Sequence, residues 1–311
     1  MSVAFIFPGQ GSQVAGMLHA LPDHPAITRT LDEVSESLGE DVRELDSARA
    51  LQSTVSVQLA LLASGVAMAR TLVEEGVRPE AVAGLSVGAF AAAVQSGVIS
   101  LSDSVRLVKQ RAEMMEELFP NGYGLAVIVG LSAKQVSVLV DAIHTEETPV
   151  YLGNINAPRQ IVIAGSDRGV TKVLETAQKN GARKAERLPV PVPSHCALLE
   201  PVAVALRTSL RTMQLNEPRM VYVGNASARA LRTGRAVAED MASNIAHVVR
   251  WHDATTVLKE LGCLLFIEMP PGRVLSELAK DAFPEVKSLA ASEGSLTHTL
   301  RVAGRYSSDV D

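Results

Sequence analysis

The stretch at residues 81–95, AVAGLSVGAFAAAVQ, constrains this chain most. Its short apolar run predicts a buried strand, GLSVG predicts a tight turn, and the alanine-rich end predicts a helix. Glycines on both sides of Ser86 would permit a strained turn that presents the hydroxyl at a helix N-terminus, where backbone N–H groups stabilise negative charge. This pattern predicts a G-x-S-x-G nucleophile elbow in an α/β protein. A plain turn between strand and helix is the alternative, because five residues match often by chance.

A second glycine-rich loop follows the first predicted strand, Val3–Phe7. The loop, PGQGSQ at residues 8–13, contains neither G-x-G-x-x-G nor G-K-[ST], so it is not a nucleotide-binding motif. Loops at the carboxyl ends of parallel strands often form binding sites. We interpret this loop either as a set of backbone donors or as a plain turn.

Two polar side chains interrupt predicted apolar helices. Gln58 lies within the long apolar helix expected at 53–75, and Arg111 lies close to the apolar side of the helix expected at 101–118. A buried glutamine is most often a satisfied core amide, and an arginine is most often solvated or paired at the surface. Either residue could instead face a site.

The order of the predicted elements changes between residues 124 and 188. Strand, helix, strand, strand, helix and strand follow one another there, which is the ferredoxin-like order. We therefore expect an α/β fold with a large α/β-hydrolase-like domain and an inserted ferredoxin-like domain. The large domain, with a parallel-sheet core, would comprise residues 1–123 and 189–291, and the insert would comprise 124–188. Residues 292–311 are polar and poorly patterned, so we expect a C-terminal tail.

Composition narrows the classes of protein that fit. The chain has 311 residues, 47% of them hydrophobic, and a formal net charge of −5, which argues against a general nucleic-acid binder. Cys196 and Cys263 offer neither a disulfide framework nor a metal-ligand spacing. The first residues lack a basic signal-peptide region, and the apolar tract at 59–69 is too short to span a bilayer. We expect a cytoplasmic protein that binds neither nucleic acid nor membrane.

A serine nucleophile needs a base, and the chain has seven histidines. His195 follows LPVPVPS at 188–194, where prolines restrict the backbone and would hold a base in one orientation. His24 and His298 lie in unpatterned stretches. Cys196 is a poor alternative nucleophile, because adjacent residues rarely face one another as a Cys–His pair. His195 is therefore the predicted base.

Five segments occur in the order found in the malonyl-CoA:acyl carrier protein transacylases. They are FPGQGSQ at 7–13, GLSVG at 84–88, QRA at 110–112, NAPRQIVIAG at 156–165 and PSHCA at 193–197. The first two together are specific, and the matches extend from Val3 to about Leu278. The chain thus resembles this acyltransferase family, which also has an inserted ferredoxin-like domain.

Within the family, the chain is most similar to the epsilon subunit of malonate decarboxylase. The segment YLGNINAPRQIVIAG at 151–165 favours that subunit. The family usually has His before the nucleophile and Glu after the second glycine, where this chain has Leu85 and Ala89. Three alternatives stay open: a transacylase of fatty-acid synthesis, an α/β-hydrolase-type esterase that would use His298, and a non-catalytic scaffold for a carrier protein.

The resemblance implies a ping-pong reaction. Ser86 would attack the malonyl thioester while His195 takes its proton, and the backbone N–H groups of Gln10 and Val87 would form the oxyanion hole. The thiol arm of a carrier protein would then resolve the malonyl ester. This chemistry needs malonyl-CoA as donor, releases CoA, and requires no metal and no tightly bound cofactor.

The resemblance also implies roles for three further residues. Arg111 would hold the free malonyl carboxylate as a bidentate pair, a geometry that lysine cannot supply. Gln58 would line the acyl site beside it. A main-chain carbonyl at Asn244 would orient the base in place of an aspartate.

The implied macromolecular partner is an acyl carrier protein. For a decarboxylase subunit, the carrier would have a phosphoribosyl-dephospho-CoA arm, and other decarboxylase subunits could also bind. Carrier proteins are usually acidic, so a local basic face is a candidate docking surface, with a solvated helix face as the alternative. The candidate docking cluster comprises Lys172, Lys179, Arg183, Lys184 and Arg187.

Overall fold

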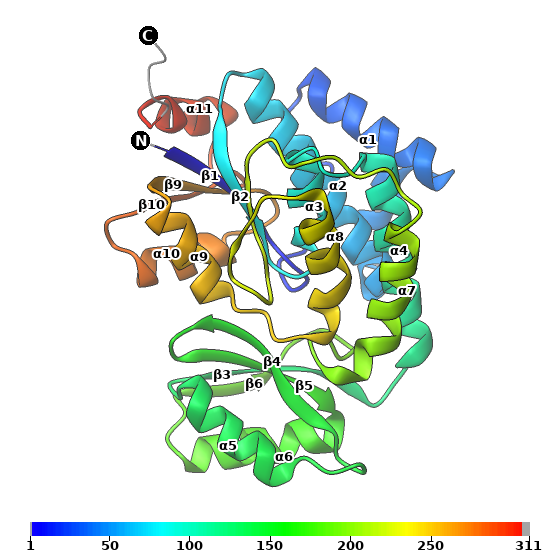
Figure 1. The fold of residues 1–311 in the computed structure, drawn as a ribbon, viewed down its shortest axis with the longest axis vertical. Helices are drawn as coiled ribbons and strands as arrows, with labels where there is room; N and C mark the ends of the chain where they lie inside the picture. Colours follow the sequence, from blue (N-terminus) through cyan, green and yellow to red (C-terminus); the bar gives the residue numbers. More distant parts are fainter. Residues whose placement is uncertain (1, 307–311) are drawn as a thin grey trace.

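The structure is a computed structural model that describes residues 2–306, and a six-stranded sheet forms the core of its larger, upper part (Figure 1). The strands lie in the order β10 (Lys287–Ala290), β9 (Cys263–Glu268), β1 (Ser2–Phe7), β2 (Pro79–Gly84), β7 (Val221–Val223) and β8 (Ala230–Leu231). Neighbouring strands are parallel, except that β8 pairs antiparallel with β7. This confirms the predicted parallel-sheet core.

Helices cover both faces of this sheet because β1 is apolar on both sides. Val3, Phe5 and Phe7 belong to one core cluster, whereas Ala4 and Ile6 belong to the other. The first cluster includes side chains of α1 (Pro25–Leu38), α2 (Thr54–Glu74), α3 (Gly88–Gln95), α4 (Leu101–Leu118), α7 (Glu200–Leu210) and α8 (Gly234–Ser243). The second cluster includes side chains of α9 (Trp251–Glu260) and α10 (Val274–Ala282).

Helix α2 is long and apolar enough to cross a membrane by length and composition alone. However, 83% of its most apolar window is buried inside the protein. It packs against α1, α3 and α4. Helix α2 is therefore the central core helix of the larger part of the molecule.

A second, four-stranded sheet forms the lower part of Figure 1. Its strand order is β4 (Val150–Ala157), β5 (Gln160–Ser166), β3 (Tyr123–Val129) and β6 (Lys184–Arg187), and all pairs are antiparallel. Helices α5 (Ala133–Ile143) and α6 (Asp167–Lys179) pack on one face. This order of strands and helices is the ferredoxin-like arrangement that the sequence predicts.

The other face of the small sheet packs against the large part of the molecule. Leu125 and Val127 of β3 belong to the same core cluster as α2 and α4. Strand β4 is joined to the large part by two backbone hydrogen bonds, from Ile155 N to Val249 O at 2.8 Å and from Val249 N to Gly153 O at 2.9 Å. A site between the two sheets is thus held by both.

Part of the C-terminal prediction is wrong. Within the expected tail at 292–311, the structure forms the helix α11 (Leu296–Gly304), in which Thr299 and Ala303 are buried. Ser295 caps its start by accepting a hydrogen bond from His298 N. Residues 307–311 of the predicted tail lie outside the described residues. Strand β6 ends at Arg187, because Pro189 and Pro191 after it cannot donate to a sheet.

Candidate active site

Ser86 lies in the turn between β2 and α3, in the strand–turn–helix setting that the sequence predicts. Its backbone φ of 56° lies in the left-handed region, which non-glycine residues seldom adopt. A Cβ atom at Gly84 would lie 2.1 Å from the backbone of Gly88, so only glycine permits this turn. The local strain presents the hydroxyl at the N-terminal end of α3.

The loop after β1 packs against this turn backbone to backbone. Leu85 N donates to Phe7 O at 2.9 Å. A Cβ atom at Gly88 would lie 2.3 Å from Phe7 O, and one at Gly9 would lie 2.8 Å from Leu85 O. The glycines therefore allow the loop with Gln10 to approach the serine.

The backbone amides of Gln10 and Val87 are free to bind a ligand. Neither donates a hydrogen bond to another residue in the part of the chain that the structure describes. Gln10 lines the small void beside Ser86, and Val87 directly follows the serine. Two free N–H groups on these neighbouring turns suit a developing oxyanion.

His195 lies directly beside Ser86, with 2.7 Å between Nε2 and Oγ. Its other ring nitrogen, Nδ1, lies 2.7 Å from the carbonyl oxygen of Asn244, and its backbone N donates to Ile245 O at 2.7 Å. Asn244 and Ile245 belong to η4 (Asn244–Ala246), the short helix that follows α8. His195 also has a positive φ, 63°, so the two facing residues both occupy strained backbone positions.

These contacts determine the protonation state of His195. Burial and the Arg111 charge lower its pKa to about 3, against a smaller opposite effect of the Asn244 carbonyl. The imidazole is therefore neutral at neutral pH. Because a carbonyl can only accept, Nδ1 carries the proton and donates to Asn244, and the Ser86 hydroxyl donates to Nε2. This is the tautomer that a general base needs.

Arg111 is buried in the same site, 1% exposed, and no carboxylate neutralises it within residues 2–306. Its Nη2 donates to Ser86 Oγ at 3.1 Å, its Nη1 donates to Gln58 Oε1, and its Nε is unpartnered. Burial lowers the pKa of Arg111 to about 9, so it remains charged at neutral pH. Both polar residues that interrupt apolar helices thus meet at this site, and a buried unpaired cation attracts an anion.

The space around Ser86 is small and contains a further buried amide. The void beside Ser86 measures about 30 Å³, enough for about one water molecule. Asn154 of β4 lines this void, and its Oδ1 has no hydrogen-bond partner among the described residues. Sequence reasoning missed Asn154 as a site residue, although it lies within the segment 151–165 that carries part of the resemblance.

A second group that sequence reasoning missed fixes the backbone of Ser86. Asn225 Oδ1 accepts a hydrogen bond from Ser86 N at 2.9 Å. Asn225 in turn donates to buried Asp240 of α8, through its backbone N at 2.8 Å and its Nδ2 at 3.3 Å. Tyr222 Oη also donates to Asp240, at 3.1 Å. Burial raises the pKa of Asp240 to about 6, against the opposing effect of these hydrogen bonds.

The predicted docking cluster lies on α6, β6 and the loop between them, away from the serine. All five side chains are exposed, but Lys184 pairs with Glu186 and Arg187 pairs with Asp167. A groove of about 630 Å³ begins at Arg187 and extends to Gln10. The structure thus joins one member of the cluster to the loop beside Ser86.

The other nucleophile and base considered from the sequence do not form the site. Burial raises the pKa of Cys196 to about 12, so its thiol stays protonated. His195, and not His298, hydrogen-bonds Ser86. Among the described residues, no group of three or more His, Cys, Asp or Glu side chains is placed to hold a metal ion.

The chain also matches known sequences over nearly its whole length. The family model described as acyl transferase domain matches residues 4–311. The malonyl CoA-acyl carrier protein transacylase of Bacillus subtilis is 35% identical over 296 residues, which cover 94% of this chain and 93% of that protein. The transacylase of the same description from Escherichia coli strain K12 is also 35% identical, over 298 residues that cover 94% of this chain and 96% of that protein.

Solved structures share the fold. The acyl-carrier-protein S-malonyltransferase of Burkholderia pseudomallei superimposes with a TM-score of 0.91 at 34% identity, covering 97% of this chain and 100% of that chain. A malonyl-transacylase in complex with its type II PKS acyl carrier protein gives a TM-score of 0.91 at 32% identity, covering 98% and 100%. The similarity therefore includes both sheets.

Proposed function

This chain belongs to the acyl transferase domain family, and from that premise we propose that it transfers malonyl from malonyl-CoA to an acyl carrier protein. The acyl group would be carried as an ester on Ser86. The observation that carries this proposal is the contact of 2.7 Å between Ser86 Oγ and the neutral His195 ring, beside a buried arginine without a carboxylate partner.

In the first half-reaction, Ser86 Oγ attacks the thioester carbonyl carbon while His195 Nε2 takes the hydroxyl proton. The oxyanion accepts hydrogen bonds from the N–H groups of Gln10 and Val87. The carbon–sulfur bond then breaks, and the imidazolium returns the proton to the CoA sulfur. The Asn244 carbonyl stabilises the imidazolium because it accepts from Nδ1–H.

The second half-reaction reverses these steps with a different thiol. The carrier's thiol loses its proton to His195 and attacks the Ser86 ester, and Oγ leaves with that proton. The groove between Arg187 and Gln10 supports a path for the thiol arm, because it connects the protein surface to the oxyanion loop.

Arg111 would select malonyl by binding its free carboxylate. In the free enzyme, its Nη atoms contact Ser86 Oγ and Gln58 Oε1, and a bound carboxylate would replace the serine contact. The void of about 30 Å³ is too small for a malonyl group, so binding requires side chains such as Met115 to move. The unpartnered amide of Asn154 is a further donor and acceptor for the acyl group.

Intact mass spectrometry tests the proposal directly. Brief incubation with malonyl-CoA should add one malonyl group to the wild-type protein and none to Ser86→Ala. With Arg111→Ala, the preference for malonyl-CoA over acetyl-CoA should disappear. Steady CoA release without an adduct would identify a hydrolase. If neither an adduct nor released CoA is detected, the scaffold alternative is favoured.

Carrier docking at the basic cluster is tested separately. Reversing two charges, with Arg183→Glu and Lys184→Glu together, should slow transfer to the carrier and leave Ser86 acylation unchanged. Lys172, Lys179 and Arg183 form no ion pair within residues 2–306, whereas Lys184 would have to leave Glu186 to bind an acidic partner. Equal loss of acylation and transfer would overturn the docking role.

The role as a malonate decarboxylase epsilon subunit is the narrower hypothesis. The relatives named above are transacylases, so they support the transacylase alternative better than this subunit. The segment YLGNINAPRQIVIAG at 151–165 motivates it, and Leu85 and Ala89 are departures from the usual family pattern that weaken a role in fatty-acid synthesis. The rates of malonyl transfer to two carriers would decide between the two roles. One carrier has a phosphopantetheine arm, and the other has a phosphoribosyl-dephospho-CoA arm. We also propose a cytoplasmic location, which the two free cysteines support.

A further inference from the structure

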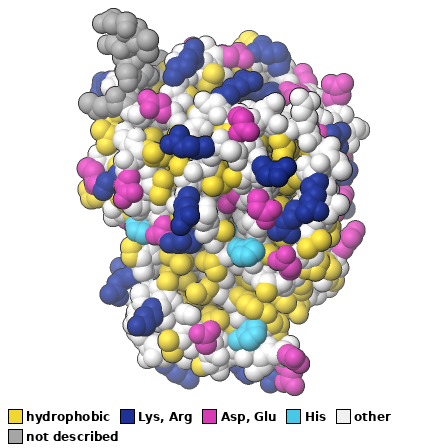
Figure 2. Space-filling view, in the orientation of Figure 1, with side chains coloured by type: hydrophobic (Ala, Val, Ile, Leu, Met, Phe, Trp, Pro, Cys, Tyr) yellow, Lys and Arg dark blue, Asp and Glu magenta, His cyan; other side chains and the backbone are white. Residues whose placement is uncertain are grey.

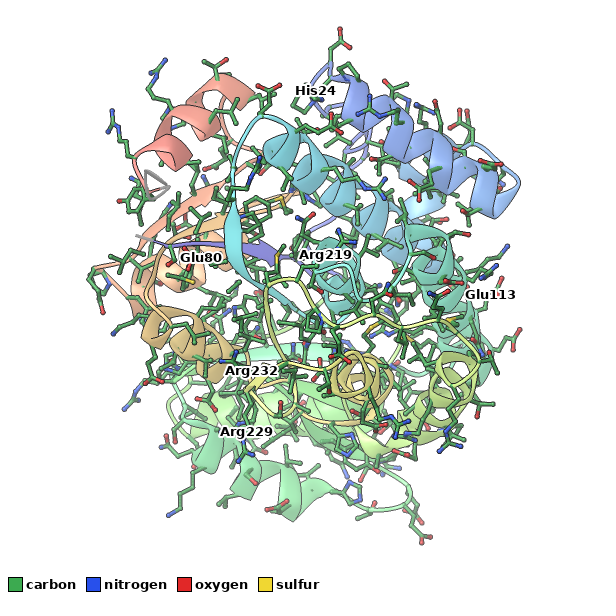
Figure 3. The ribbon with its side chains drawn as sticks, turned by 45° about the horizontal axis from the view of Figure 1, so that its top comes forward. His24, Glu80, Glu113, Arg219, Arg229 and Arg232 are labelled. Carbon is green, nitrogen blue, oxygen red and sulfur yellow. The ribbon has the colours of Figure 1, made fainter. Side chains whose placement is uncertain are left out.

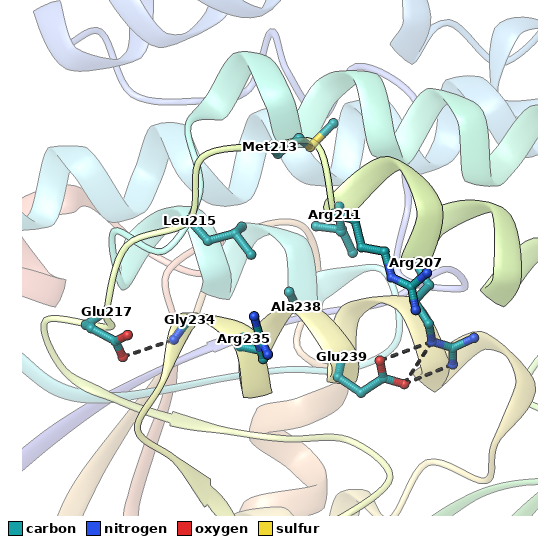
Figure 4. A pocket seen from close by; sticks show the side chains of 10 residues that line it. Arg207, Arg211, Met213, Leu215, Glu217, Gly234, Arg235, Ala238 and Glu239 are labelled. Carbon is teal, nitrogen blue, oxygen red and sulfur yellow. Dashed lines mark hydrogen bonds and ion pairs between the residues drawn. The ribbon is translucent and has the colours of Figure 1, made fainter.

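A second cavity, of about 690 Å³, lies between α8 and the segment that follows α7 (Figure 4). Its volume lies in the range of sites that bind small molecules. The end of α7, the connecting segment after it and the first half of α8 form the walls. His195, Arg111 and Asn225, whose side chains hydrogen-bond Ser86, do not line this cavity, so it is a separate site.

The cavity combines an apolar floor with cations that lack partners. Leu210 and Ala238 are 3% and 7% exposed, and Met213 and Leu215 are half-buried beside them. Arg211 and Arg235 also line the cavity, and neither side chain forms a hydrogen bond or ion pair within the described part of the chain.

The acidic residues of the cavity are already engaged. Glu239 accepts hydrogen bonds from Arg207, with the shortest distance 2.9 Å to Nη2, and Glu217 accepts one from Gly234 N at 3.1 Å (Figure 4). Three arginines and two glutamates line the cavity, so its lining carries a net charge of +1 in a chain whose net charge is −5, and Arg211 and Arg235 form no ion pair within the described residues. Figure 2 shows dark blue side chains together with magenta ones over the region of α7 and α8.

We propose that this cavity binds a small amphipathic anion, an acyl chain that ends in a carboxylate, and that its occupancy alters acylation of Ser86. The apolar floor would accommodate the chain, and Arg211 and Arg235 would bind the carboxylate by charge-assisted hydrogen bonds. The second part of the proposal rests on the proposed function.

Helix α8 provides the physical connection between the two sites. Arg235, Ala238 and Glu239 face the cavity, whereas the next residue, Asp240, holds Asn225 and through it Ser86 N. The same helix leads into η4, whose two carbonyls hold His195. A small shift of α8 would thus move the supports of both reacting side chains.

Calorimetric titration with octanoate tests the site. Two further probes are titrated for comparison: 1-octanol, which lacks the carboxylate, and butyrate, which lacks most of the apolar chain. Octanoate should bind the wild-type protein at least about tenfold more tightly than either probe, because only octanoate uses both parts of the cavity. The Arg211→Ala/Arg235→Ala variant should bind octanoate at least about tenfold more weakly.

A matched control removes two other exposed arginines from the same part of the chain. Arg229 and Arg232 lie between β7 and α8, carry no ion pair within residues 2–306 and do not line the cavity (Figure 3). The Arg229→Ala/Arg232→Ala variant should bind octanoate like the wild type. Equal weakening in both variants, or no octanoate binding, would overturn the site.

The effect on acylation is measured on the same proteins by rapid-quench mass spectrometry. Saturating octanoate should change the rate of malonyl-Ser86 formation at least about threefold in the wild type and the control variant, and not in Arg211→Ala/Arg235→Ala. If octanoate binds but the acylation rate does not change, the connection through α8 is overturned and only the binding site stands. Failure of the wild type to form any acyl-serine would instead count against the proposed function.

Discussion

The two sides of Ser86 differ in what they contain and in what they can do. On the Oγ side, His195 and Arg111 are ionisable groups that point at the reacting atom, beside two free backbone amides. On the N side, Asn225 and Asp240 hold the backbone of the serine in a closed set of hydrogen bonds. Polar groups on the Oγ side lack hydrogen-bond partners until a ligand binds, whereas Asn225 and Asp240 on the N side already bond one another.

This difference shows how the site keeps a reactive arrangement in place. The Oγ side leaves a buried guanidinium Nε and the Asn154 Oδ1 unpartnered, which is unfavourable in the free protein. The N side offsets this cost with satisfied hydrogen bonds around Asp240. We therefore expect substitutions on the Oγ side to change chemistry and those on the N side to change stability and positioning.

The largest effect should come from His195→Ala, because it removes the proton acceptor. We expect Ser86 acylation to fall by about 10³-fold, with the folded structure retained. Rapid-quench mass spectrometry measures this rate. His247→Ala is the matched control, since His247 is exposed and its side chain hydrogen-bonds only the Ser243 carbonyl among the described residues, and it should leave the rate within about twofold.

The pH profile sharpens the same prediction. Because burial holds the pKa of His195 at about 3, its imidazole stays neutral well below pH 6.5. The acylation rate of the wild type should therefore lack the decline near pH 6.5 that an ordinary histidine base would cause. A decline centred near pH 6.5 would show that His195 is not held in this environment.

Arg111→Ala should have the next largest effect, and on one substrate only. We expect malonyl transfer to Ser86 to fall by about 10²-fold and acetyl transfer to change by less than about threefold, because only malonyl has a carboxylate to bind. Arg111→Lys should restore only part of the malonyl rate, because an ammonium keeps the positive charge but cannot form the bidentate pair. Arg106→Ala, on the exposed side of the same helix, is the control. Equal losses for both substrates would contradict the selective role.

The sequence predicts the Oγ side far better than the N side. Ser86 is marked by flanking glycines, His195 by prolines, and Gln58 and Arg111 by being polar within apolar helices, and the structure brings all four together. Each of these signals is local, because a strained turn or an interrupted apolar face is visible within a few residues.

The N side depends on contacts that no local pattern reveals. Asn225 lies 139 positions from Ser86 and follows a strand of only three residues. A polar residue after a short strand is usually part of a turn, so nothing nearby indicates its partner. The ion pair of Arg187 with Asp167 likewise depends on a residue distant in the chain. Helix α11 is different, because Leu296, Thr299, Leu300 and Ala303 recur at helical spacing on its packed side, so a local signal was present there.

Asn225→Ala tests the N side with an intermediate effect. It leaves the amide of Ser86 and part of Asp240 without partners, so we expect the free energy of unfolding to fall by about 1–3 kcal/mol. Acylation should slow by about tenfold because the strained backbone of Ser86 loses its support. Urea denaturation and acylation rates measure the two effects. Asn216→Ala removes one exposed side-chain hydrogen bond and should change neither by much.

Asp240→Asn should have the smallest effect on acylation and a distinctive effect on stability. The native pKa of Asp240 is raised to about 6 from 3.8, so the native state holds its proton at pH values where the unfolded state has released it. The unfolding free energy of the wild type therefore falls as pH rises through this window. From about pH 4.5 to pH 7 this one group should lower it by about 2 kcal/mol. Asp240→Asn has no carboxyl group to titrate at this position. The unfolding free energy of the variant minus that of the wild type should therefore increase by about 2 kcal/mol between about pH 4.5 and pH 7. Parallel curves in urea denaturation would show that Asp240 is an ordinary ionised carboxylate, and that the N side carries a charge at every working pH.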